Sequence, residues 1–340
     1  MIDSQELNGD QRREVVNTRQ RYAAYREAEQ RAKSYRGSMT WTHIRGHGYL
    51  VRSRYGKSGV RRQTSLGLRS KETEAIKLEY ERGRAEAQQR LKTLKAAITR
   101  QSAINRALGL GRVPLIGAKI VRALDQAEML GSGIRVLGTN AIYAFEAAAG
   151  VHIDPGFTTT EDIDLLLDAR RGLTFAAQEN VTQPSLLHLL QKIDRSFTRS
   201  TQPFRAVNRD GYLVDLIKPL RNPPWADEGP RVGGNPDDLL AVETEGLAWH
   251  ESAPSFEAVT IDERGEPCRI VATDPRVWAA HKLWLSKRQD REPVRRRRDA
   301  AQARVVARLV AEFMPHLPYD AEQLQMLPKA VFEEAASLFK

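Results

Sequence analysis

The pattern of hydrophobic and polar residues divides the chain near residues 107–113. Before this boundary, two long stretches rich in Arg, Ala, Glu and Gln predict polar helices, and two short β-rich stretches between them predict a hairpin. The expected elements are helices at 12–37 and 71–106, with Ser70 as the N-cap of the second, and strands near 49–51 and 63–66 on either side of a Gly-Lys-Ser-Gly turn. Gly109, Gly111 and Pro114 then interrupt the helical pattern.

Beyond this boundary, short hydrophobic strands alternate with amphipathic helices. The expected helices are 114–130, 140–149, 184–197, 276–287 and 299–314, and the expected strands are 134–137, 162–167, 212–217 and a hairpin of 256–261 with 268–272. Alternation of this kind predicts an α/β or α+β domain. We expect three regions, namely a basic helix–hairpin–helix at 1–107, a core at 108–235, and a C-terminal hairpin and helical region at 236–340.

The composition is that of an ordinary globular protein. The chain has 340 residues, of which 41% are hydrophobic and 28% charged. Its one cysteine, Cys268, excludes an intramolecular disulfide and a cysteine-based zinc site. Hydrophobic stretches are too short for a membrane span, and the first residues lack the hydrophobic segment of a secretory signal. We therefore expect a protein of the reducing cytoplasm with no membrane partner.

The positive charge is concentrated near the N-terminus. The formal net charge is +10, and the segment from Arg31 to Ser70 contains ten basic residues and no acidic one. A segregated basic segment is typical of proteins that bind nucleic acid, although a solvated basic surface that only aids solubility is the alternative. The candidate nucleic-acid contacts are Arg45, Arg52, Arg54, Lys57, Arg61 and Arg62.

Candidate catalytic chemistry lies in the segment around Asp162 and Asp164. These aspartates are two positions apart on an expected strand, so their side chains point to the same face. Two adjacent carboxylates repel each other when ionised, and a cation between them relieves the repulsion. Because Mg²⁺ binds one or two carboxylates together with substrate phosphates, the pair predicts a metal site.

Two other segments carry residues that suit the same chemistry. Gly138 and Thr139 follow a hydrophobic strand and open a helix, so the backbone amides and the hydroxyl can hold phosphate oxygens. Asp215 interrupts an otherwise hydrophobic strand, where a lone carboxylate is costly unless a metal or a hydrogen-bond network pairs with it. The alternative for Asp215 is an aspartate in a salt bridge at a sheet edge.

Together these segments resemble the nucleotidyltransferase superfamily that includes DNA polymerase β. In that superfamily a strand ends in Gly-Ser or Gly-Gly before a helix, Asp-x-Asp/Glu lies on the next strand, and a third carboxylate lies on a later one. Gly138-Thr139 matches the first element, Asp162 and Asp164 the second, and Asp215 the third. Thr139 replaces the usual serine. The 24 positions from Gly138 to Asp162 exceed the usual spacing, which implies an insertion at about 150–159.

The surrounding sequence looks like a poorly characterised bacterial branch of this superfamily, over most of the chain. The resemblance implies an α+β, polymerase β-like core and a Mg²⁺ (or Mn²⁺) site formed by Asp162, Asp164 and Asp215. It also implies that Gly138, Thr139 and Asn140 bind the phosphates of a nucleoside triphosphate. Asp215 would then help to activate an acceptor hydroxyl, and pyrophosphate would leave.

Similarity to abortive-infection nucleotidyltransferase toxins extends the expectation to the C-terminal region. In those toxins a helical lysine and a later aspartate complete the site, and Lys282 and Asp299 occupy such positions here. The alternative is a surface lysine and an acid at a helix N-terminus. The implied function is transfer of a nucleotide to RNA, tRNA-like, by a toxin or defence element with an antitoxin partner. The alternatives are DNA as the nucleic acid, a catalytically silent nucleic-acid-binding protein, and an enzyme that acts on a protein or small molecule.

Overall fold

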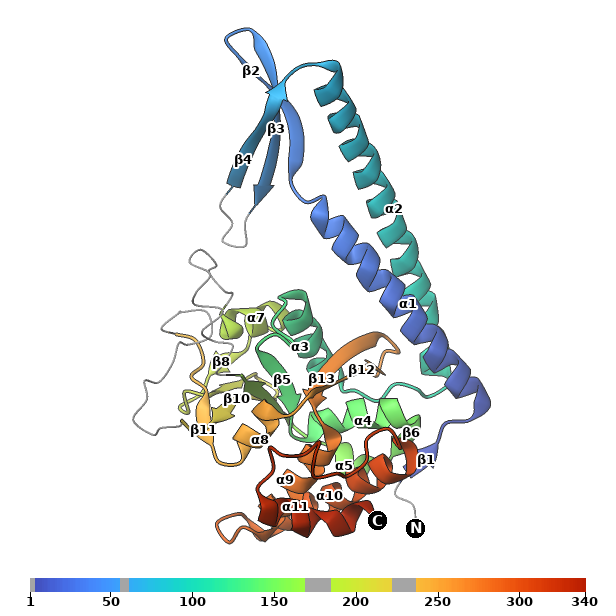
Figure 1. Ribbon diagram of the computed structural model, residues 1–340, viewed down its shortest axis with the longest axis vertical. Coiled ribbons are helices and arrows are strands. Elements are labelled where there is room, and N and C mark those ends of the chain that lie inside the picture. Colours follow the sequence, from blue (N-terminus) through green and yellow to red (C-terminus); the bar gives the residue numbers. More distant parts are fainter. Residues whose placement is uncertain (1–3, 56–60, 169–184, 222–236) are drawn as a thin grey trace.

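The computed structural model describes residues 4–55, 61–168, 185–221 and 237–340. It consists of a body, which holds most of the chain, and an arm that projects from it (Figure 1). The arm is made of two long helices, α1 (Gly9–Ser34) and α2 (Lys71–Ala107), with a three-stranded sheet between them along the chain. The sheet has the antiparallel order β2 (Ser38–Ile44), β3 (His47–Tyr55) and β4 (Arg61–Leu68).

Both arm helices begin at residues whose side chains satisfy the free backbone amides of the first turn. The Asn8 side chain accepts from the amide of Gln11, and the Gln11 side chain accepts from the amide of Asn8. Ser70 and Thr73 form the equivalent pair at the start of α2. The prediction of Ser70 as an N-cap is therefore confirmed, and the first helix begins three residues earlier than its pattern indicated.

Buried polar contacts join the base of the arm to the body. The hydroxyl of Thr18 on α1 donates to Asn105 Oδ1 on α2 over 3.0 Å, and the Asn105 amide donates to the Gly265 carbonyl of the body over 2.9 Å. Arg26 pairs with Asp125, which also pairs with Arg269. These contacts fix the direction in which the arm leaves the body.

A mixed sheet forms the centre of the body. Its strand order is β5 (Ile134–Leu137), β7 (Asp162–Leu167), β10 (Leu213–Pro219), β9 (Arg205–Val207) and β8 (Thr198–Arg199), and β11 (Val242–Thr244) also pairs with β10. β7 and β10 are parallel, whereas β5 is antiparallel to β7 and β9 is antiparallel to β10. A mixed sheet with helices agrees with the expected α+β class.

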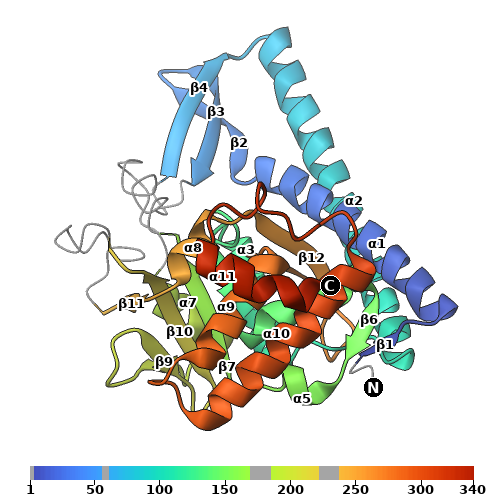
Figure 2. The same ribbon diagram turned by 60° about the horizontal axis from the view of Figure 1, so that its bottom comes forward.

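Helices and two small antiparallel pairs of strands surround this sheet (Figure 2). The remaining elements up to β6 and α5 are β1 (Ser4–Glu6), α3 (Leu115–Gln126), the short helix η1 (Thr139–Ala141), α4 (Ile142–Ala149), β6 (Val151–Ile153) and α5 (Pro155–Thr158). The later elements are α7 (Leu186–Ile193), α8 (Leu247–Ser252), β12 (Ser255–Ile261), β13 (Pro267–Thr273), α9 (Pro275–Lys287), α10 (Pro293–Phe313), α11 (Lys329–Ala335) and η3 (Ala336–Phe339). The segment expected as an insertion thus forms β6, which pairs with β1, and α5.

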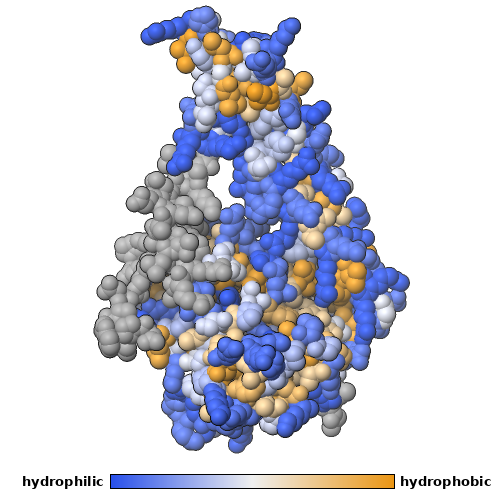
Figure 3. Space-filling view, in the orientation of Figure 1, coloured by the Kyte–Doolittle hydropathy of each residue, from blue (hydrophilic) through white to orange (hydrophobic). Residues whose placement is uncertain are grey.

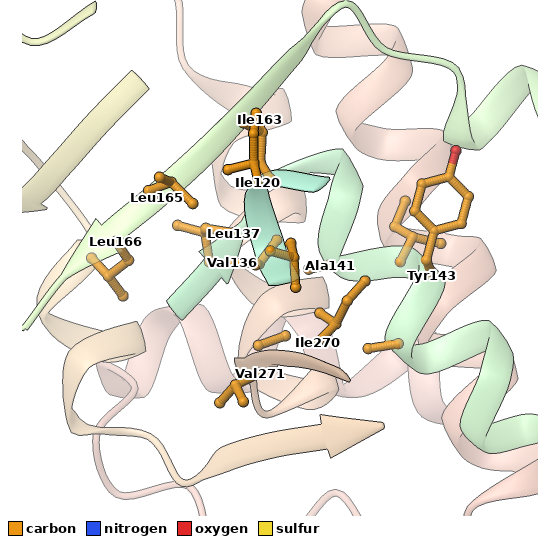
Figure 4. Packing of buried hydrophobic residues seen from close by; sticks show 14 of the residues in the cluster. Ile120, Val136, Leu137, Ala141, Tyr143, Ile163, Leu165, Leu166, Ile270 and Val271 are labelled. Atoms are coloured by element: carbon orange, nitrogen blue, oxygen red, sulfur yellow. The ribbon is translucent and has the colours of Figure 1, made fainter. Parts of the chain in front are cut away.

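One hydrophobic core crosses the boundary expected at residue 235. Side chains of β5 and β7, among them Val136, Ile163 and Leu165, pack in the same cluster as Ile270 of β13 (Figure 4). The cluster also includes Trp278 of α9 and residues of α10. The regions 108–235 and 236–340 are therefore one packed unit. Among the described residues, no helix is both long and hydrophobic enough to span a membrane.

Candidate active site

The register of three strands brings the predicted carboxylates together. Asp164 of β7 lies directly opposite Asp215 of β10 in parallel register, so the two side chains share one face of the sheet. Asp162 is two residues before Asp164 and shares this face. Ile163 and Leu165 point to the other face and are fully buried in the core, which anchors the strand that carries the acids. The alternation of polar and hydrophobic residues in β7 thus produces an acidic face backed by a packed core.

Gly138 fits against Asp164 because it has no side chain. It follows β5, whose last residue, Leu137, is the cross-strand partner of Asp164. Its φ is +59°, and a Cβ built on it would lie 1.9 Å from Asp164 Oδ2. Its carbonyl accepts a hydrogen bond of 3.1 Å from the Trp278 indole on α9. The turn after β5 is therefore held between the acidic strand and the C-terminal helices.

Thr139 and Asn140 lie in η1, directly after this glycine, and both are buried. Asn140 Nδ2 donates to the carbonyl of Asp162 over 2.7 Å, so this amide holds the start of the acidic strand. The Thr139 hydroxyl accepts from Gln302 Nε2 over 3.3 Å, and the same nitrogen donates to the Phe157 carbonyl over 2.7 Å. The structure thus gives the Asn140 side chain a positioning contact.

Asp215 forms a salt bridge to Arg205 with both of its oxygens. Arg205 Nε lies 2.7 Å from Oδ1 and a terminal guanidinium nitrogen lies 2.6 Å from Oδ2. The two residues are cross-strand partners on β9 and β10. Asp215 is therefore salt-bridged, as in the alternative derived from the sequence, but β10 lies between β7 and β9 rather than at a sheet edge. A bidentate arginine pair of this kind is a strong charge-assisted contact.

Burial and the two neighbouring carboxylates disfavour the ionised form of Asp164. Burial is the largest cause, followed by the negative charge of Asp162, and Asp215 acts in the same direction. The result is a pKa of about 7 for the Asp164 carboxyl, although the positive charges of Lys282 and Arg291 lower it. A cation bound by Asp162 and Asp164 would relieve this penalty. The acidic face therefore has the electrostatic character of a cation site.

Lys282 and Asp299 lie together in the structure, and neither is on the surface. Lys282 Nζ is 2.8 Å from Asp299 Oδ1, and Arg291 Nε bonds the other carboxylate oxygen. The ammonium also lies 5.3 Å from the centre of the Trp278 ring. Asp299 is well inside α10, which begins at Pro293, so the alternative of an acid at a helix N-terminus does not hold. Lys282, Arg291 and Asp299 together thus carry one net positive charge, and Lys282 and Arg291 act electrostatically on Asp164 of the acidic face.

Several residues of the site were not predicted from the sequence, namely Arg205, Trp278, Arg291 and Gln302. Gln302 is three residues after Asp299, so helical spacing from Asp299 could have suggested it. Arg205 belongs to a three-residue strand whose pairing the sequence does not reveal. Only the register of β9 against β10 places Arg205 beside Asp215.

The basic residues proposed to contact nucleic acid have different environments. Arg45, Arg54, Arg61 and Arg62 are exposed on the arm, and Lys57 lies outside the described residues. Arg52 is only 6% exposed, and its guanidinium donates to the Tyr80 hydroxyl and to the carbonyls of Ser38 and Arg36. The expectation for Arg52 is therefore corrected, because its charged group is enclosed and holds the sheet onto α2.

Two of the three carboxylates are placed to bind a hard divalent cation, and the third is occupied by a salt bridge. Carboxylate oxygens suit Mg²⁺ or Mn²⁺, and Asp162 and Asp164 together give the number of protein ligands that Mg²⁺ commonly uses. Asp215 is bound to Arg205, and within the described parts of the chain no group of three His, Cys, Asp or Glu side chains is arranged to hold a metal. The fit thus rests on Asp162 and Asp164, and Asp215 could join only by leaving Arg205.

Comparison with protein families assigns the body of the molecule to one family. A family model described as nucleotidyltransferase matches residues 117–327, a range that includes Gly138, the three aspartates, Lys282 and Asp299. Comparisons with curated proteins and with solved structures gave no match. The matched range is well over half of the 340 residues, and it contains every element that forms the acidic site. The chain therefore belongs to this nucleotidyltransferase family.

Proposed function

We propose that the protein transfers a nucleotide from a nucleoside triphosphate to a hydroxyl acceptor and releases pyrophosphate. The observation that carries the proposal is the shared face of Asp162, Asp164 and Asp215, with Gly138 in contact range of Asp164. The family assignment supports nucleotide transfer in general. The metal, the triphosphate and the acceptor are part of the proposal.

Asp162 and Asp164 would hold Mg²⁺ or Mn²⁺, which when bound supplies charge neutralisation and orients the triphosphate. The backbone amides after Gly138 and the Thr139 hydroxyl would bind phosphate oxygens, because the turn leaves no side chain between the backbone and the acidic face. Lys282 and Arg291 provide positive charge to balance the incoming triphosphate.

In the reaction, the acceptor oxygen forms a bond to the α-phosphorus. The bond from the α-phosphorus to the oxygen bridging to the β-phosphate breaks, and its electron pair leaves with pyrophosphate. The hydroxyl proton passes to a carboxylate of the site. Asp215 can accept it once Arg205 no longer occupies both of its oxygens, and the negative phosphates of the substrate are suitable alternative partners for that guanidinium.

We further propose RNA, of the tRNA type, as the acceptor, and a role as a toxin or defence element that an antitoxin partner would neutralise. The acid-free basic segment of residues 31–70 favours a nucleic-acid acceptor over a small molecule. Retention of three acids on a face suited to phosphates argues against a silent binding protein, since uncompensated acids would repel the ligand.

The test is incubation of the purified protein with Mg²⁺, each α-labelled nucleoside triphosphate in turn, and total cellular RNA. We expect label in an RNA band, lost in Asp162→Asn and Asp164→Asn. Asp10→Asn is the matched control, because it removes one exposed carboxylate from α1, which carries none of the three acids. Label that persists in both site variants would refute the metal assignment, and label on the protein itself would replace RNA by a protein acceptor.

A further inference from the structure

The sheet at the end of the arm has one covered and one uncovered face. Leu50 and Arg52 of β3 point toward α2, where Leu50 is fully buried and the Arg52 guanidinium lies 4.3 Å from the centre of the Tyr80 ring. Residues one position along each strand point the other way. In the part of the chain that the structure describes, no helix lies on that second face, and Figure 1 shows the sheet projecting beyond the body at one end of the long axis.

Short polar side chains occupy much of the uncovered face. Thr40, Val51 and Ser65 are cross-strand partners, and so are Ser38, Ser53 and Gln63. Of these, Thr40, Ser65 and Gln63 are exposed, as is Thr42 two residues after Thr40. The face therefore offers a flat set of hydroxyl and amide groups that both donate and accept hydrogen bonds.

Arginines lie at both ends of this face. Arg61, the cross-strand partner of Tyr55, is exposed on this face at one end, and Arg45 is exposed in the turn between β2 and β3 at the other, where its φ is +50°. Arg54 and its partner Arg62 are also exposed, but they lie on the opposite face, which Arg52 shares. Figure 3 shows hydrophilic residues at the extremities of the arm tip with hydrophobic ones between them. Since residues 31–70 contain no acid, the surroundings of the sheet favour a polyanion.

The shape of the face distinguishes between kinds of nucleic acid. Short hydroxyl side chains cannot reach base edges at the floor of a major groove about 8.5 Å deep. The minor groove of an A-form RNA helix is wide and shallow and exposes ribose 2′-hydroxyls, which are partners for threonine, serine and glutamine. Phosphates on either side of that groove are partners for arginine.

We propose that the uncovered face of the β2–β3–β4 sheet binds the minor groove of a double-stranded RNA segment. Thr40, Thr42 and Ser65 contact 2′-hydroxyls, and Arg45 and Arg61 contact phosphates. This inference rests on the proposed function and names its acceptor class as an RNA with a helical stem.

The length of the arm sets a minimum size for such an acceptor. α2 has 37 residues and so extends for roughly 55 Å. Figure 1 places the sheet at one end of the molecule and α9 and α10, which carry Lys282 and Asp299, toward the other. The buried contacts of Thr18 and Asn105 prevent the arm from folding down freely. An RNA held at both places must therefore be a folded molecule rather than a short oligonucleotide.

The test measures binding of a 20-base-pair RNA duplex to the full chain in EDTA without nucleotide, by fluorescence anisotropy at several salt concentrations. The variant Arg45→Gln/Arg61→Gln removes the two charges at the ends of the uncovered face. The control Arg54→Gln/Arg62→Gln removes two exposed charges from the opposite face of the same sheet. We expect the first variant to lose at least tenfold in affinity at 100 mM salt and about two units of the log–log salt slope, and the control to bind like wild type.

A second variant tests the hydroxyl contacts. Thr40→Val/Thr42→Val/Ser65→Ala keeps the charge, and we expect it to lower the preference for RNA over a DNA duplex of the same sequence by at least fivefold. Three results would each overturn the proposal. The two charge variants could lose the same affinity, wild type could bind DNA and RNA duplexes equally well, or wild type could bind single strands alone. Binding of a protein through Ile44 and Leu68, both 53% exposed, in place of RNA would overturn it as well. Asp162→Asn should bind the duplex normally. Duplex binding can therefore be judged separately from nucleotide transfer, even if the proposed transfer activity fails.

Discussion

Two buried histidines lead to a specific prediction about the pH dependence of stability. His250 of α8 and His281 of α9 have ring centres 4.5 Å apart, and the rings of Trp249 and Trp284 lie against His281. Both nitrogens of His250 and Nε2 of His281 are buried without a hydrogen-bond partner. Burial, followed by the positive charges of Lys282 and Arg135, lowers the pKa of His250 to about 3, and burial likewise lowers the pKa of His281.

The sign of the effect follows from proton uptake by the unfolded chain. An unfolded histidine takes up its proton near pH 6.5, whereas the folded protein keeps His250 neutral until about pH 3. The contribution of the neutral ring to the free energy of unfolding is therefore fully present above pH 6.5, and it is lost as the pH falls toward 3. At pH 5 the unfolded pKa is 1.5 units above the pH, so His250 alone removes roughly 2 kcal/mol from the free energy of unfolding.

Urea unfolding followed by tryptophan fluorescence at pH 7.5 and pH 5.0 measures this loss. The variant His250→Gln removes the titrating ring, and His47→Gln changes an exposed histidine of the arm as a control. We expect the pH-dependent loss to shrink by about 2 kcal/mol in His250→Gln and to remain unchanged in His47→Gln. An equal loss in wild type and His250→Gln would refute the reasoning, because the ring would then not be the group that takes up the proton.

Three further predictions concern the site. Gly138→Ala should reduce nucleotide transfer at least a hundredfold, because its Cβ would overlap Asp164 Oδ2. Gly150 has a similar φ of +69° but free space around it, so Gly150→Ala should lower the free energy of unfolding, measured with urea, by only about 1 kcal/mol. Arg205→Gln should tighten Mn²⁺ binding, measured by electron paramagnetic resonance, about tenfold because Asp215 becomes free; weaker binding would mean that Arg205 positions the acid. Lys282→Met should destabilise the fold by about 3–5 kcal/mol by leaving Asp299 to Arg291 alone, and a double-mutant cycle with Asp299→Asn should show coupling; additive effects would contradict the pairing.

The acidic face could be predicted because its signals are local. Asp162 and Asp164 are two residues apart in a strand, and Asp215 interrupts a hydrophobic one, so the period of two fixes the face of each acid. The family resemblance implied that Asp215, on a later strand, joins them in one metal site. The structure confirms that they are neighbours, with Asp164 opposite Asp215.

The environments of the arginines could not be predicted in this way. A run of basic residues does not show which guanidinium will be enclosed, and Arg52 is buried because the pairing of β3 turns it toward Tyr80. The sequence also gave no strong signal for β2, which completes a three-stranded sheet where only a hairpin was expected. Likewise, Arg205 meets Asp215 through long-range pairing, which no local pattern encodes.

The continuous core has a consequence for the order in which the site is made during synthesis. The chain emerges from the ribosome with its N-terminus first, so Asp162, Asp164 and Asp215 appear before α9 and α10. Trp278, which donates a hydrogen bond to the Gly138 carbonyl, and Asp299, which pairs with Lys282, follow all three acids in the chain. A nascent chain that stops short of α9 and α10 therefore carries the acids without the indole and the cations beside them. The finished site arises only after α9 and α10 have been synthesised.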